Sequence, residues 1–131
     1  MKVLIVDDEA PARERLKRLI QDIDGYEVAG EAANGMEAVQ IFNRIQPEIV
    51  LLDIRMPVMD GIEAAQHLSN HESPPAGIFT TAYGDHALQA FETHAVGYLL
   101  KPIRRERLEE ALKATQRTTR AQAGNIAEDT K

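Results

Sequence analysis

The sequence lacks cysteine altogether and has no long apolar segment. Without cysteine, the 131-residue chain has no disulfides, no thiol nucleophile and no thiolate ligands for zinc. No stretch approaches the roughly 18 apolar residues that a membrane span requires. The apolar start of the chain meets Asp7-Asp8-Glu9 too early for a signal peptide. We therefore expect a cytoplasmic protein that does not bind membranes.

The chain also lacks the positive charge that is typical of nucleic-acid-binding proteins. Its net charge is -6, which argues against direct contact with nucleic acid. We therefore expect no nucleic-acid-binding residues in this chain. Positive charge gathers in residues 101–120, where seven Lys and Arg against three Glu give a local balance of +4. A solvated helix face explains this better than a nucleic-acid patch. A surface for a partner, such as a second copy of the chain, is the sharper alternative.

Short apolar runs alternate with amphipathic stretches along almost the whole chain. Predicted strands cover residues 2–6, 26–32, 48–52, 77–80 and 96–100, and predicted helices begin at 10, 34–35, 60, 85 and 104. Five successive β-then-α units predict the α/β class, with a parallel sheet covered by helices on both faces. We expect one domain over residues 1–120. The polar residues 121–131 are predicted to be a disordered tail or the start of an interdomain linker.

Polar residues stand where four of the predicted strands end. They are Asp7 with Asp8, Asp53, Thr81 and Lys101. Because ligands of open α/β sheets bind outside the carboxyl ends of the strands, we expect these side chains to gather there. Taken singly, most have a structural explanation: the first aspartates could cap a helix, and the threonine and lysine could be ordinary turn and surface residues. Asp53 is the hardest to explain structurally, because an unpaired charge at the end of a buried strand is costly.

A cluster of this composition is suited to phosphoryl chemistry. Carboxylates brought together raise each other's pKa unless a cation intervenes, and an oxygen-rich site suits Mg²⁺. The ammonium of Lys101 and the hydroxyl of Thr81 would complete a receptor for a phosphoryl group. A carboxylate can itself act as nucleophile and become an aspartyl phosphate. Asp53 is the best candidate, since it is isolated on its own strand.

Several segments resemble the response-regulator receiver domains of two-component signalling. The matching segments are residues 3–9, 49–57, 60–61, 81–82 and 97–102, in the correct order and spacing within residues 2–118. Residues 86–92 and 95–102 further resemble receivers of the LytR/AlgR type, which usually precede a LytTR DNA-binding domain. The resemblance implies a flavodoxin-like, doubly wound (βα)5 sandwich with a five-stranded parallel sheet of order 2-1-3-4-5.

The resemblance also implies which residues bind the metal and which residue accepts the phosphoryl group. Asp53 would accept a phosphoryl group from the histidine of a sensor histidine kinase. Mg²⁺ would be held by Asp8, Asp53 and the backbone carbonyl of Arg55, with Asp7 acting through water. Apart from catalysing its own phosphorylation and dephosphorylation, such a domain is not a classical enzyme.

By the same resemblance, a second group of residues would bind the phosphoryl group and respond to it. Lys101 would pair with the phosphoryl oxygens, and its peptide bond to Pro102 would be cis. Thr81, followed by Ala82, would bind the phosphoryl group, and Tyr98 would then turn inward. This movement would reshape the face formed by the fourth helix, fifth strand and fifth helix. That face would control dimerisation or a transcriptional output domain, so DNA would be reached only through a domain absent from this chain.

Two other classes of function stay open. A phosphohydrolase with an aspartyl nucleophile usually has a second acid two residues later, where this chain has Arg55. A pseudo-receiver would serve only as an interaction module, and the complete set of acceptor, lysine and threonine argues against it. Arg55 and Tyr83 also depart from the commonest receivers at positions that influence water access to the acyl phosphate. A stand-alone receiver and part of a longer regulator are both compatible with the sequence.

Overall fold

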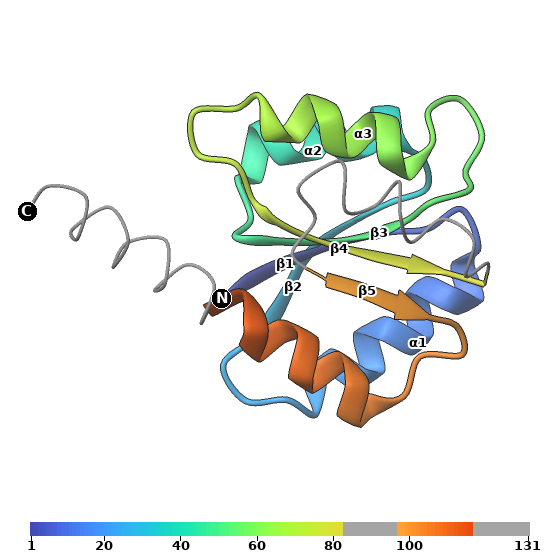
Figure 1. The fold of residues 1–131 in the computed structure, drawn as a ribbon, viewed down its shortest axis with the longest axis vertical. Helices are drawn as coiled ribbons and strands as arrows, with labels where there is room; N and C mark the ends of the chain where they lie inside the picture. The colour runs from blue at the N-terminus through green and yellow to red at the C-terminus, as the bar shows by residue number, and fades with distance from the viewer. Residues whose placement is uncertain (83–96, 117–131) are drawn as a thin grey trace, which may run out of the picture.

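Five strands and at least four helical segments make up the part of the chain that the computed structural model describes, residues 1–82 and 97–116 (Figure 1). The strands are β1 (Lys2–Val6), β2 (Glu27–Ala32), β3 (Ile49–Asp53), β4 (Ala76–Thr81) and β5 (Gly97–Leu100). The helices are α1 (Ala10–Gln21), α2 (Gly35–Ile45) and α3 (Gly61–Ser69), and residues 105–116 are also helical. The helix predicted for residues 85–93 and the tail predicted for 121–131 lie outside the described residues.

The strands form a single parallel sheet of order β2-β1-β3-β4-β5, which confirms the predicted topology. From β1 the chain first moves to β2 at one edge, and it then returns to place β3 on the other side of β1. The order therefore reverses between β1 and β3. In open α/β sheets ligands bind at such a point, outside the carboxyl ends of the strands.

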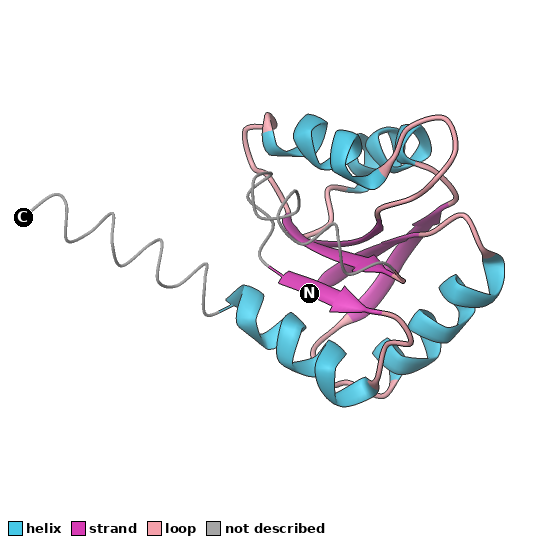
Figure 2. Cartoon of the chain, turned by 45° about the vertical axis from the view of Figure 1, so that its right-hand side comes forward, coloured by secondary structure: helices cyan, strands magenta, loops and turns pink. Residues whose placement is uncertain are grey.

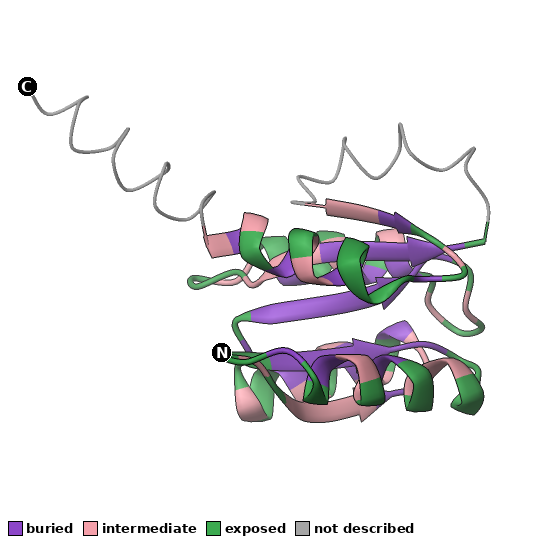
Figure 3. Cartoon of the chain, turned by 90° about the horizontal axis from the view of Figure 1, so that it is seen from below, coloured by how far each residue is buried: buried purple, intermediate pink, exposed green. Residues whose placement is uncertain are grey.

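Helices cover both faces of the sheet, which explains the near-continuous apolar strands (Figure 2). Alternate residues of β1 belong to different core clusters: Val3 and Ile5 pack with α1 and the 105–116 helix, whereas Leu4 and Val6 pack with α2 and α3. All residues of β3 are buried, and Figure 3 shows the inner strands in the colour of buried residues, whereas the edge strands β2 and β5 and the helices carry intermediate and exposed positions. The central strand therefore holds its last residue, Asp53, at the boundary of the core.

Local sequence signals set the helix ends that border the site. Asn34 and Asp60 occupy the N-caps of α2 and α3, and their side chains accept hydrogen bonds from the N–H groups of Glu37 and Glu63. α2 ends at its C-cap Gln46, which adopts a left-handed conformation with a φ of 46° just before Pro47. In the described part of the chain, no helix has the length and apolar character needed to cross a membrane.

Candidate functional site

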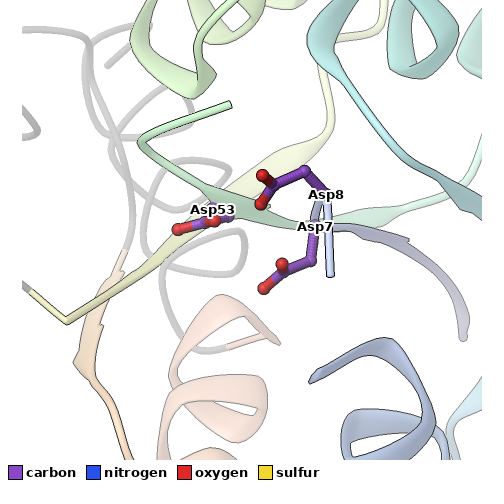
Figure 4. A group of neighbouring side chains, drawn as sticks. All are labelled: Asp7, Asp8 and Asp53. Atoms are coloured by element: carbon purple, nitrogen blue, oxygen red, sulfur yellow. The ribbon is translucent and has the colours of Figure 1, made fainter. Parts of the chain in front are cut away.

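Three carboxylates converge at the carboxyl edge of the sheet (Figure 4). Asp7 and Asp8 follow β1, and Asp53 is the last residue of the neighbouring strand β3. One carboxylate oxygen from each lies within 4.8 Å of the others. Asp7 and Asp53 are buried, whereas Asp8 is exposed to solvent. The strand order thus brings together residues 46 positions apart, as the endings of the apolar runs predict.

Asp7 is fully buried, and its carboxylate and both backbone groups have partners. Its carboxylate accepts hydrogen bonds from the N–H of Glu9 at 2.9 Å and from Lys101 Nζ at 2.7 Å. Its own N–H donates to the Ala32 carbonyl at 3.0 Å, and its carbonyl accepts from Arg13 at 2.7 Å. The N-cap of α1 is Glu9, which makes no side-chain capping hydrogen bond. The alternative that Asp7 serves only to cap the first helix is therefore wrong.

Asp53 is a carboxyl group in an unfavourable place for a negative charge. Burial and the charge of Asp7 raise the pKa of its carboxyl from 3.8 to about 6, and Asp8 adds to the effect. Lys101 opposes this shift, because its Nζ lies 3.7 Å from Asp53 Oδ2. Lys101 does not cancel the upward shift of the Asp53 pKa, so a further cation would stabilise the charged carboxylates of the cluster.

The raised pKa of Asp53 makes the stability of the metal-free protein depend on pH. Because the folded state binds the proton more tightly than the unfolded chain does, the favourable contribution is complete below pH 3.8 and is lost as the pH rises through about 6. Asp53→Asn, which stays neutral, is expected to be more stable than the wild type at neutral pH by up to about 3 kcal/mol. The difference should vanish near pH 4.

Urea unfolding in a chelator at acid and at neutral pH measures this difference. Two proteins of equal stability at neutral pH would contradict the prediction. Asp60→Asn is the matched control, because it removes the same charge from an exposed residue and asparagine also caps helices well.

Lys101 extends from the edge strand β5 to the acidic cluster, where it contacts Asp7 and Asp53. It follows β5, and its N–H donates to the Thr81 carbonyl at 2.7 Å. Burial would lower the pKa of its ammonium, but the hydrogen bond to Asp7 and the charge of Asp53 outweigh this and raise it. Lys101 is therefore a cation in this site, and its nearest carboxylate is that of Asp7. Its peptide bond to Pro102 is cis, as the resemblance implies.

The remaining predicted site residues differ in how far they are buried. Thr81 ends β4 and is buried, Ala82 after it is exposed, and Arg55 has an exposed position in the loop after β3. Tyr98 in β5 is partly buried and packs against the core cluster beneath α2 and α3. The helix predicted for residues 85–93, which would complete the output face beside Tyr98, lies outside the described residues.

The loop after Asp53 returns tightly onto the strand it leaves. The N–H of Gly61 donates to the Ile54 carbonyl at 2.8 Å. A Cβ atom at position 61 would lie 2.1 Å from the backbone oxygen of Asp53 and 2.9 Å from its carbonyl carbon. Glycine is therefore required by this close approach of two backbones. The Asp60-Gly61 pair both begins α3 and allows its first turn to pack on the phosphoacceptor candidate.

Thr80 is a buried polar residue to which the sequence analysis assigned no role. It is fully buried and pairs with Asp53 in the register of β3 and β4. Among the described residues, its Oγ1 atom has no hydrogen-bond partner. The sequence signal is only its place before Thr81, which does not tell which of the two hydroxyls is satisfied.

Thr80→Val is expected to raise the free energy of unfolding by about 1 kcal/mol, because it removes an unsatisfied hydroxyl and keeps the shape. Thr115→Val is the matched control, since the buried Thr115 hydroxyl donates to the Leu112 carbonyl at 2.6 Å. That change should lower the free energy of unfolding by a similar amount. Urea unfolding of both variants provides the measurement, and a destabilised Thr80→Val would show that the hydroxyl is bonded.

This doubly wound sheet, with carboxylates and a lysine at its carboxyl edge, has the fold and site of a receiver domain. Residues 3–113 match the family described as "Response regulator receiver domain", and the chain belongs to that family. It is a receiver domain of a response regulator in two-component signalling. Within the family it is of the LytR/AlgR type, as the sequence resemblance indicated.

Curated relatives of this chain include regulators of transcription. It is 54% identical over 123 residues to the positive alginate biosynthesis regulatory protein of Pseudomonas aeruginosa. The aligned residues cover 93% of this chain and 50% of that protein. It is 46% identical over 112 residues to the transcriptional regulatory protein BtsR of Salmonella typhi, covering 86% of this chain and 46% of BtsR. The chain thus spans about half the length of the curated relatives it matches.

Solved structures of similar fold are also receivers, which confirms the predicted flavodoxin-like architecture. The response regulatory domain of protein mrkE from Klebsiella pneumoniae superposes with a TM-score of 0.83 at 33% identity, covering 90% of this chain and 97% of that one. A chain of the CheX-CheY-BeF3-Mg+2 complex from Borrelia burgdorferi gives a TM-score of 0.80 at 28% identity, with 86% of each chain covered.

Proposed function

We propose that this receiver is a phosphorylation-dependent switch in which Asp53 accepts the phosphoryl group. The observation that carries the proposal is the position of Asp53, which shares one space with two further carboxylates and lies 3.7 Å from the ammonium of Lys101. Receiver domains interact with histidine kinases and regulate output domains. The donor to Asp53 is accordingly the phosphohistidine of a sensor kinase.

The donor set of the acidic cluster fits Mg²⁺. This ion prefers oxygen ligands and usually keeps several waters besides one or two carboxylates. Asp8 and Asp53 would be direct ligands together with the backbone carbonyl of Arg55. Both carboxylate oxygens of Asp7 already accept hydrogen bonds, so Asp7 would act through water. When bound, the ion would neutralise negative charge on the carboxylates and on the incoming phosphoryl group. The similar Borrelia structure is that of a complex with both Mg²⁺ and BeF3, which is a phosphoryl mimic.

The residues of the chain supply the remaining chemistry. An oxygen of deprotonated Asp53 forms a P–O bond as the P–N bond of the phosphohistidine breaks, and the imidazole keeps the electron pair. Lys101 leaves Asp7 to pair with the phosphoryl oxygens, and the Thr81 hydroxyl donates a hydrogen bond to them. Attack of water later releases phosphate, so the domain catalyses both its phosphorylation and its dephosphorylation. The backbone of Ala82, next to Thr81, also binds the phosphoryl group.

The signal then passes to an output face. Tyr98 turns further inward as Thr81 moves, and the face of the fourth helix, β5 and the fifth helix changes shape. That face controls homodimerisation or a transcriptional output domain, as the name of BtsR suggests for that relative. In this proposal the receiver occupies residues 1–120, residues 121–131 are a tail or linker, and the protein works in the cytoplasm without binding membranes.

Incubation with acetyl phosphate tests the proposed phosphoryl transfer. We expect one phosphoryl group per chain, gained only when Mg²⁺ is present and lost again in strong base, as acyl phosphates are. Intact-mass spectrometry measures both properties. Release of phosphate over many turnovers from general phosphate esters would instead indicate a phosphohydrolase. A chain that neither binds Mg²⁺ nor takes up phosphate would be an interaction module only.

A further inference from the structure

Arg13 contacts the backbone of the acidic cluster from outside the site. It lies in the second turn of α1, and its guanidinium donates to the carbonyl oxygen of Asp7 at 2.7 Å. The side chain is 19% exposed, so the contact is mostly shielded from water. This hydrogen bond connects α1 to the end of β1, where the chain enters the turn that carries Asp8.

Glu31 holds Arg13 in this position. Its Oε1 atom lies 3.1 Å from Arg13 Nε, and its Oε2 atom lies 2.6 Å from Lys17 Nζ, one helical turn further along α1. Glu31 is a residue of β2 and pairs with Ile5 of β1, so it is on the sheet face that α1 covers. One carboxylate thereby fixes two cations of α1, and only Arg13 passes the restraint on to Asp7.

The consequence falls on Asp8 because of peptide geometry. A peptide unit is planar, so fixing the carbonyl oxygen of Asp7 also fixes the plane that contains the N and Cα atoms of Asp8. Within the described part of the chain, no hydrogen bond orients the exposed carboxylate of Asp8. Its direction therefore depends on the backbone that Arg13 holds.

We propose that Arg13, held by Glu31, is a positioning residue of the divalent-cation site: it orients the Asp7–Asp8 peptide so that the Asp8 carboxylate faces Asp53. This inference rests on the Mg²⁺ site of the proposed function. Residues that orient metal ligands commonly change metal affinity by about 10- to 100-fold when they are replaced. Arg13 differs from them in acting on a ligand through the backbone, so we expect the lower end of that range.

Charge alone makes the opposite prediction, which allows a clean test. Arg13 is a cation near a cation site, so removing its charge without any loss of positioning would leave Mg²⁺ affinity equal or higher. Lys17→Gln is the matched control. It deletes the same charge from the same helix and the same Glu31 carboxylate, but Lys17 makes no contact with the Asp7 carbonyl.

The experiment is a calorimetric MgCl₂ titration of wild type, Arg13→Gln, Arg13→Lys and Lys17→Gln. Arg13→Gln is expected to bind Mg²⁺ about tenfold more weakly, and Lys17→Gln as tightly as wild type or slightly more so. Arg13→Lys should recover part of the affinity, because a lysine can still donate to the carbonyl. Urea unfolding without Mg²⁺ identifies any variant that is not folded. If Arg13→Gln is not folded, the Mg²⁺ affinity of Arg13→Lys compared with that of wild type tests the inference instead.

The outcomes separate this inference from the proposed function. If wild type does not bind Mg²⁺, the proposed metal site fails. If wild type binds Mg²⁺ and Arg13→Gln binds equally or more tightly, the metal site stands and the positioning role is overturned. Equal losses in Arg13→Gln and Lys17→Gln would also overturn it, because the loss would then follow charge or the Glu31 network rather than the contact with Asp7.

Discussion

Replacement of Asp53 by asparagine is expected to abolish phosphoryl uptake from acetyl phosphate in the presence of Mg²⁺. Asparagine keeps the size of the side chain but has no anionic oxygen to attack phosphorus, and it removes one ligand of the cation. Loss of a nucleophile commonly lowers rates by about 10³-fold or more. The initial rate of phosphoprotein formation, measured by intact-mass spectrometry, should therefore fall below detection.

Asp60→Asn shows whether the loss is specific to the site. Asp60 is an exposed aspartate that caps α3 in the loop next to the cluster, and asparagine can make the same cap. It removes one negative charge, as Asp53→Asn does, yet its rate should stay within about twofold of wild type. Equal uptake of phosphate by wild type and Asp53→Asn would refute the assignment of the phosphoacceptor.

Gly61→Ala is expected to destabilise the fold by about 3 kcal/mol or more. The added methyl group would lie 2.1 Å from the Asp53 backbone oxygen, and the atoms in its way are backbone rather than a mobile side chain. Either α3 must move away from β3, or the end of β3 must shift. Since Asp53 is at that end, the change should also weaken Mg²⁺ binding. Urea unfolding and a MgCl₂ titration measure the two effects.

Gly77→Ala controls for the general cost of replacing glycine. A Cβ atom at Gly77, in β4, meets nothing within 4 Å. That variant should be as stable as wild type or slightly more stable, because alanine loses less backbone entropy on folding. A Gly61→Ala protein with the stability of wild type would show that the loop accommodates a side chain, and the close packing of the two backbones would then have no structural role.

The sequence predicts the fold and the membership of the acidic cluster because both depend on coarse periodicity. Apolar runs on both faces of a parallel sheet identify strands such as β3, and polar residues at their ends fall at one edge whatever the detailed packing. The caps at Asn34 and Asp60 are equally local, since each needs only a short polar side chain before a helix. Asp53 can be recognised for the same reason, because it is a charged residue at the end of an otherwise apolar strand.

Hydrogen-bond partners could not be predicted in the same way. Asp7 and Asp8 are adjacent in sequence, yet one is fully buried with its carboxylate and backbone bonded and the other is exposed. This difference follows from where β1 ends relative to α1 and from the rotamers of Arg13 and Lys101. The unsatisfied hydroxyl of Thr80 depends likewise on the register between β3 and β4. Such contacts are set by three-dimensional packing, for which the spacing of residue types carries no signal.

The 105–116 helix runs from the region of the acidic cluster to the opposite end of the domain. The helix begins just after the loop that carries Lys101 and Pro102, beside the acidic cluster. Gln116, its last described residue, donates to the Tyr26 hydroxyl at 3.1 Å and contacts Met1, both of which lie at the amino ends of strands. Twelve helical residues span about 18 Å, so Gln116 lies at the end of the domain opposite Asp53. In the proposed switch, phosphorylation of Asp53 would therefore affect Gln116 by moving this helix or by altering the surface of the domain, and not by direct contact with it.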